Sequence, residues 1–148
     1  MAKFNYAYQK IVDLKGSERM QAEWLLSAAV GKLQAEETSL VRLREEREMW
    51  TGRVHAASAE AVPLAQLLTM QQYVDYIDVC IAQKQADVRK AERAADEKRM
   101  ELSEKMKDEK VWQKSKENAL QLFRAALLSK EQSELDEMAT VRFMMPAP

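Results

Sequence analysis

Residue types that carry enzyme chemistry are few in this chain of 148 residues, and they do not stand in reactive combinations. His55 is the one histidine, and no second histidine or cysteine is placed at the spacing of a metal site. Cys80 is the one cysteine and has no apparent base partner to activate its thiol. A glycine-rich phosphate loop is also missing. We therefore expect no catalytic residue, no metal site and no cofactor, and we expect that the chain is not an enzyme.

Charged side chains are abundant but mixed in sign, with 23 Lys and Arg against 24 Asp and Glu and a net charge of −1. Because acids and bases are interspersed, no long single-sign field exists to attract nucleic acid or an anionic membrane, and we expect no nucleic-acid partner. The run at residues 89–110 holds many acid and base pairs at helical spacing, each of which stabilises an exposed helix by ~0.2 to 0.5 kcal/mol. We interpret this run as a solvated helix face.

The elements that position these side chains must be α-helices. Residues that favour helix dominate the composition, and the strand-forming residues are too dispersed to make alternating runs. The chain has three glycines and three prolines, and none of them lies between Leu64 and Met145. An almost wholly helical chain is credible if its helices are long and paired as a coiled coil. The sequence therefore predicts an all-α fold.

A single turn is predicted in the segment HAASAEAVPLAQLL, residues 55–68, where small residues, a gap in charge and a proline coincide. Proline discourages helix in the residue before it and is tolerated in the first turn of a new helix. Pro63 therefore suits the start of the second helix. We expect one coiled-coil domain over residues 1–148. Its predicted segments are a first helix at about 3–57, a turn at about 58–63, a second helix at about 64–141 and a tail at 142–148.

Two apolar stripes with steps of three and four match when the chain folds back on itself. The first stripe consists of Ala22, Leu26, Ala29, Leu33, Glu36, Leu40, Leu43, Arg47, Trp50 and Val54. The second consists of Met70, Val74, Ile77, Ile81, Lys84, Val88, Ala91, Ala95, Lys98 and Leu102. Folding at about residues 61–62 places Trp50 opposite Val74, and Ala29 opposite Ala95. The stripes predict an antiparallel two-helix hairpin with larger residues near the turn.

The second helix is predicted to overhang the first. A helix of ~55 residues spans roughly 80 Å, whereas one of ~75 residues spans roughly 110 Å. The register places Phe4 beside Leu120. The apolar residues beyond this point, which the first helix leaves unpaired, are Phe123, Leu127, Leu128, Leu135 and Met138. An exposed apolar helix of this kind predicts a protein partner.

The sequence also predicts a cytoplasmic protein. No apolar run reaches the ~18 to 20 residues that span a bilayer, and the segment MAKFNYAYQK lacks the apolar stretch of a signal peptide. One cysteine precludes an internal disulfide and fits a reducing compartment.

Four segments, in this order, resemble FliJ proteins of the bacterial flagellar export apparatus. They are FNYAYQKIVDLKGSE at 4–18, LQAEE at 33–37, MQQYVDYID at 70–78 and SELDEMATVRF at 133–143. The resemblance implies a non-enzymatic component of the flagellar type III export apparatus that acts as the central stalk of the hexameric export ATPase. It also implies contact with the cytoplasmic domain of the export-gate protein FlhA, and escort of export chaperones. The implied location is the cytoplasm, peripheral to the inner membrane at the flagellar basal body through the gate only.

The resemblance also implies where partners bind. The gate face carries over to Ser39, Leu43, Glu46, Trp50, Tyr73, Ile77, Cys80 and Lys84. Glu46 and Lys84 depart from the residue types typical of this face. For the ATPase ring, the candidates are Phe4, Tyr8, Ile11, Phe123, Leu127 and Met138. For Phe4 and Ile11, a hydrophobic clasp that prevents fraying is the alternative interpretation.

Two other functions remain open at this point. The first is a generic cytoplasmic coiled-coil adaptor or homodimer, in which the same stripes pair between two chains. The second is the equivalent stalk protein of a virulence type III secretion system. The stalk interpretation predicts a chain that is a monomer when free.

Overall fold

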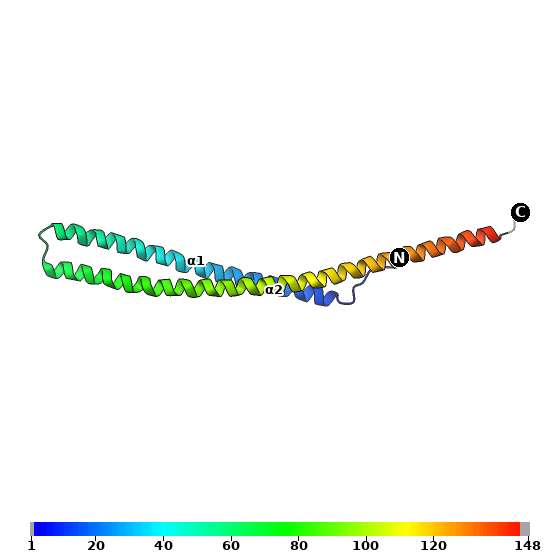
Figure 1. Cartoon of the computed structure of the whole chain (residues 1–148), viewed down its shortest axis with the longest axis horizontal. Helices are drawn as coiled ribbons and strands as arrows, with labels where there is room; N and C mark the ends of the chain where they lie inside the picture. Colours follow the sequence, from blue (N-terminus) through cyan, green and yellow to red (C-terminus); the bar gives the residue numbers. More distant parts are fainter. Residues whose placement is uncertain (1, 146–148) are drawn as a thin grey trace. The chain divides into compact units, whose positions relative to one another are not determined.

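Two long helices make up nearly all of the computed structural model, which describes residues 2–145 (Figure 1). Helix α1 spans Gln9–Ala59 and helix α2 spans Leu64–Met144. The described residues contain no strand, and contacts between the helices pair early residues of α1 with late residues of α2. These observations confirm the predicted all-α antiparallel hairpin with a longer second helix.

The contacts divide the chain into two compact units. We call residues 21–103 the turn unit, and residues 1–20 together with 104–148 the terminal unit. Each unit contains a piece of both helices and has its own packing.

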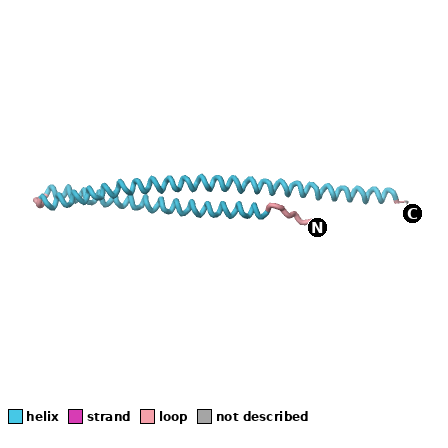
Figure 2. Tube along the Cα trace, turned by 90° about the horizontal axis from the view of Figure 1, so that it is seen from below, coloured by secondary structure: helices cyan, strands magenta, loops and turns pink. Residues whose placement is uncertain are grey.

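Figure 2 shows that the turn between the helices is short. Pro63 is the last residue before α2 begins at Leu64. Helix α1 ends at Ala59, slightly later than predicted. The main-chain N–H of Val62 donates to the Glu60 carbonyl at 2.9 Å. The Pro63 carbonyl then accepts from the N–H groups of Gln66 and Leu67, at 3.0 and 3.3 Å. These are the first bonds of α2, whose start at Leu64 agrees with the predicted boundary.

The turn unit packs along the predicted stripes. Its buried side chains are Ala22, Leu40, Val74, Ile77, Val88, Ala91 and Ala95. Every predicted stripe position is buried or half-buried except Arg47, which is exposed. Arg47 lies there as one half of an ion pair with Asp78 of α2. The spacing of the apolar residues therefore gave the seam correctly, and the long arginine side chain carries its charge to the solvent.

The size of the buried side chains along the seam decreases with distance from the turn, as predicted. Ile77, near the turn, is 2% exposed, while Ala95, farther from the turn, is 0% exposed. A small side chain such as that of Ala95 lets the two helix backbones approach more closely. The two polar stripe residues Glu36 and Lys84 face each other, with Lys84 Nζ 2.9 Å from Glu36 Oε2. The hydrogen bond to Glu36 raises the pKa of Lys84, and burial opposes this.

The terminal unit corrects the predicted start of the first helix. The sequence predicted helix from about residue 3, but residues 2–8 are not helical and α1 begins at Gln9. We call residues 2–8 the N-terminal strap. Its aromatic side chains Phe4, Tyr6 and Tyr8 are two residues apart, and all three contact α2. Residues 7–8 form a turn that leads into α1, in which the N–H of Gln9 donates to the Tyr6 carbonyl at 3.1 Å.

The strap packs on α2 through three aromatic residues. The Phe4 and Phe123 rings lie 5.5 Å apart between centroids, and the Tyr8 and Trp112 rings lie 6.0 Å apart. The Tyr6 hydroxyl is 2.8 Å from Ser115 Oγ, and Tyr6 is 8% exposed. A non-helical segment can advance farther per residue than the ~1.5 Å of a helix, and Phe4 reaches beyond the predicted Leu120 to Phe123. Phe123, predicted to be unpaired, is therefore covered by Phe4.

Ion pairs continue the pairing in the helical part of the terminal unit. Lys15 Nζ is 2.7 Å from Asp108 Oδ2, and Arg19 Nε is 2.7 Å from Glu109 Oε2. The hydrogen bond with Asp108 raises the pKa of Lys15, whereas burial lowers it. Such half-exposed pairs contribute little stability individually but fix which residues lie opposite each other.

The last part of α2 has no described residue packed on it. All residues from 128 to 145 are exposed, and we call them the C-terminal helix segment. Of the predicted tail at 142–148, residues up to Met144 belong to α2, and residues 146–148 lie outside the described residues. The predicted unpaired apolar helix is therefore present from Leu128 onward.

Candidate protein-binding surfaces

The predicted gate face lies in the turn unit, and its aromatic residues meet there. Trp50 and Tyr73 pack edge to face, with centroids 4.9 Å apart. The Tyr73 hydroxyl donates to Glu46 Oε1 at 2.6 Å. Tyr73 of α2 therefore contacts two residues of α1. It can reach both because Glu46 and Trp50 are four residues apart and share a helix face.

Other predicted gate residues are less accessible. Ile77 is 2% exposed and belongs to the seam between the helices. Lys84 is paired with Glu36, while Ser39, Leu43 and Cys80 are half-buried. The structure therefore brings Glu46, Trp50 and Tyr73 together at the surface, and it gives Ile77 a packing role in the hairpin.

Two further residues, Tyr76 and Arg53, join this aromatic group and were not among the predicted site residues. The Tyr76 ring lies 6.3 Å from the Tyr73 ring and is 62% exposed. The Arg53 guanidinium carbon lies 4.8 Å from the centre of the Trp50 ring. Each stands three residues from an aromatic residue of the predicted face, which is the spacing of neighbours on a helix surface. That spacing was a usable signal in the sequence.

The Tyr73 hydroxyl gives a pH test of this surface. Its hydrogen bond to the Glu46 carboxylate is the main cause that raises the pKa of Tyr73, with burial and the charge of Glu46 next. Because the pKa is raised in the folded chain, the stabilising contribution is full below the ordinary tyrosine pKa of about 10. It is lost as the pH rises through the folded pKa.

We expect Glu46→Gln to lower the pKa of Tyr73 toward its ordinary value, since the charged acceptor is removed. Tyrosine absorbance followed during an alkaline titration measures this, and Tyr73→Phe identifies the Tyr73 component among the four tyrosines. An unchanged Tyr73 titration in Glu46→Gln would contradict the hydrogen bond.

The predicted ATPase-ring residues lie in the terminal unit and fall into two groups. Phe4, Tyr8 and Phe123 belong to the contact between the strap and α2, where Phe4 and Phe123 are half-buried and Tyr8 is 55% exposed. Ile11 is half-buried on the first turn of α1. This first group holds the terminal unit together and also leaves part of its aromatic surface open.

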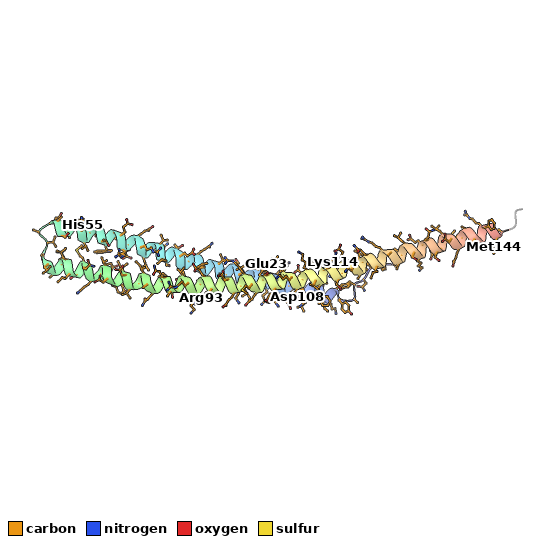
Figure 3. The ribbon with its side chains drawn as sticks, viewed as in Figure 1. Glu23, His55, Arg93, Asp108, Lys114 and Met144 are labelled. Carbon is orange, nitrogen blue, oxygen red and sulfur yellow. The ribbon has the colours of Figure 1, made fainter. Side chains whose placement is uncertain are left out.

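The second group belongs to the last part of α2. Leu127 is half-buried, and Met138 is 58% exposed. Three more apolar residues share the Met138 side of the C-terminal helix segment: Leu128, Leu135 and Val141, which are 66%, 60% and 56% exposed. Figure 3 shows side chains projecting from α2 on every side as it approaches the labelled Met144. An apolar stripe at steps of three and seven is the surface by which a helix binds a protein groove.

Among residues 2–145, no three His, Cys, Asp or Glu side chains are gathered in a way that could hold a metal ion. Within the same residues, no helix combines the length and apolar character needed to cross a bilayer.

The fold and these surfaces define a class of protein, a long antiparallel helical hairpin that presents apolar and aromatic side chains on its exterior. The model of the flagellar FliJ proteins matches residues 4–147, and the chain belongs to the FliJ family. The family consists of structural components of type III export, and this places the chain in the same class.

A solved structure supports the fold independently. The protein CT670 from Chlamydia trachomatis, assigned as a YscO homolog, is similar to this chain with a TM-score of 0.60 and 17% sequence identity. The similarity covers 95% of this chain and 96% of that chain. No curated protein is matched by the sequence.

Proposed function

We propose that this chain is a stalk protein of the flagellar type III export apparatus, whose terminal unit inserts into the ring of the export ATPase. The main support for this proposal is the exposure of the C-terminal helix segment. Its residues from 128 to 145 are exposed and include an apolar stripe through Leu135 and Met138. Exposed apolar stripes on a helix are stabilised by burial against a partner, and a ring with a central opening offers such a groove to a single helix.

The family supports the choice of partner. The chain is matched by the flagellar FliJ family over residues 4–147, and the export ATPase is the partner that the resemblance to this family implies. The stalk role requires a chain that is a monomer when free, because the stripes of the turn unit are used within one molecule. The packing of Val74, Ile77 and Leu40 within a single chain supports this.

The turn unit is proposed to contact the cytoplasmic domain of the export gate. Its support is the aromatic pair of Trp50 and Tyr73, because aromatic residues at a surface are enriched among the residues that dominate binding. This contact would link the ATPase to the gate and would bring the chain to the inner membrane without inserting it. Escort of export chaperones is part of the same proposal and is supported by the family alone.

The stalk function is tested by adding the chain to its cognate export ATPase and measuring the rate of ATP hydrolysis. We expect binding and an increased rate, because a stalk favours assembly of the ring. Light scattering of the free chain at micromolar concentration is expected to give the mass of a monomer. A stable dimer, together with no effect on the ATPase, would instead favour a generic coiled-coil adaptor.

A stalk of a virulence type III secretion system is the second candidate. It is favoured by the fold similarity to CT670, with a TM-score of 0.60. Parallel binding measurements with a flagellar and a virulence ATPase from the same cell distinguish the two. Preference for the flagellar ATPase is expected.

A further inference from the structure

The aromatic group near the turn has a composition that goes beyond the predicted gate face. Trp50 and Tyr73 pack together, Tyr76 lies next to Tyr73, and Arg53 lies over Trp50. Trp, Tyr and Arg are the three residue types most enriched among residues that dominate protein interfaces. All four belong to the turn unit, so their arrangement is fixed by one packed helix pair.

Accessibility differs among these residues. Trp50 is half-buried and Tyr73 is 38% exposed, with its hydroxyl committed to Glu46. Tyr76 is 62% exposed, and Arg53 is exposed as well. The inner pair therefore forms a rigid base, and the outer pair offers most of the surface that a partner can cover.

Among the charged side chains around the aromatic group, Arg53 differs from its neighbours. The carboxylate of Glu46 accepts the Tyr73 hydroxyl, and the nearby Arg47 and Asp78 pair with each other. Arg53 makes no ion pair with any residue in the described part of the chain. The Arg53 guanidinium carbon lies 4.8 Å from the centre of the Trp50 ring, and the side chain is exposed, so its N–H donors are open to a carboxylate of a partner.

We propose that Trp50, Arg53, Tyr73 and Tyr76 form one docking patch, and that its occupant is a surface of the export gate in which a carboxylate stands beside an apolar side chain. The carboxylate pairs with Arg53, and the apolar side chain packs against the Tyr76 and Tyr73 rings. This inference rests on the proposed contact with the gate. It adds Arg53 and Tyr76 to that contact and assigns Ile77 to the hairpin core.

Binding of the full chain to the purified cytoplasmic domain of the gate tests the patch. We expect Tyr76→Ala and Arg53→Gln each to weaken binding by about tenfold, the scale of interface residues of these types. The matched control for Arg53→Gln is Arg42→Gln, an exposed arginine of the same helix that contacts none of the four patch residues. Its affinity is expected to equal that of the unmodified chain.

The dependence of binding on salt concentration shows whether the partner surface carries a carboxylate or is purely apolar. Raising the ionic strength is expected to weaken binding of the unmodified chain more than binding of Arg53→Gln, because the variant has lost the charge that is screened. Since Tyr76 and Arg53 are exposed, circular dichroism should show full helicity in both variants.

The outcomes distinguish the two proposals. No binding of the unmodified chain would overturn the gate contact, and the patch assignment with it. Binding that is unchanged in Tyr76→Ala and Arg53→Gln would overturn the patch alone. An equal loss in Arg42→Gln and Arg53→Gln would also overturn it, because the effect would then reflect general charge.

Discussion

Replacement of Ile77 by alanine is expected to destabilise the hairpin by about 2 to 5 kcal/mol, the range for truncating a buried aliphatic side chain. Ile77 is 2% exposed and is the largest side chain buried to this degree among the described residues. A two-helix seam has few other buried large residues to compensate. Because folded domains have a net stability of roughly 5 to 15 kcal/mol, this loss is a large share of the total. Thermal unfolding followed by circular dichroism measures it.

The matched control is Val79→Ala, two residues away on the same helix. Val79 is 56% exposed, so its truncation removes little buried area and should change stability by less than about 0.5 kcal/mol. Comparing Ile77→Ala with Val79→Ala also shows whether Ile77 acts in packing the hairpin or in binding the gate. If Ile77→Ala keeps the melting temperature of the unmodified chain and still loses gate affinity, then Ile77 is a binding residue and its assignment to the core is wrong.

The hairpin could be predicted from the sequence because two simple signals agree. Apolar residues at steps of three and four mark the seam, and Pro63 marks the start of the second helix. Every long stretch of the chain favours helix, so no competing structure arises over residues 9–59 or 64–144. The register followed from the turn position, and the ring contact between Trp50 and Tyr73 lies within one residue of the predicted pairing.

The N-terminal strap was missed because helix propensity was extended to the start of the chain. Phe4, Tyr6 and Tyr8 repeat with a period of two, which is the period of an extended segment. Three residues of this kind are too few to define a strand by pattern alone. What decides their conformation is the aromatic surface of Trp112 and Phe123, more than a hundred residues away in sequence.

The binding surfaces could be predicted only in part, and for a physical reason. The resemblance placed Trp50, Tyr73 and Glu46 on one face, and the three are in contact in the structure. Neither the resemblance nor a spacing of three and four residues shows which member of a face turns into the seam, and Ile77 was therefore given a surface role. The position of Arg53 over Trp50 depends on side-chain conformation, which a repeat of three or four residues leaves open.

Replacement of both Leu135 and Met138 by glutamine is expected to abolish stimulation of the export ATPase while leaving the hairpin folded. These side chains are 60% and 58% exposed in the free chain, so their loss removes no packing from it. Leucine, methionine and glutamine have similar helix propensities, and α2 should therefore remain helical. Burial of two such side chains in a partner is worth at least about 2 kcal/mol, so binding should weaken by roughly thirtyfold or more. Hydrolysis by the ATPase, titrated with each variant, measures the effect.

The matched control places two glutamines on the opposite side of the same segment, at Ser133 and Thr140. Both positions are exposed, and at 100° per residue they point away from the stripe that contains Leu135 and Met138. This control is expected to stimulate the ATPase as the unmodified chain does. Equal loss in both double variants would mean that the segment acts through its helicity or length, and full activity in both would remove the apolar stripe from the ATPase contact. Loss confined to the Leu135 and Met138 variant is the result that insertion of this helix face into the ring requires.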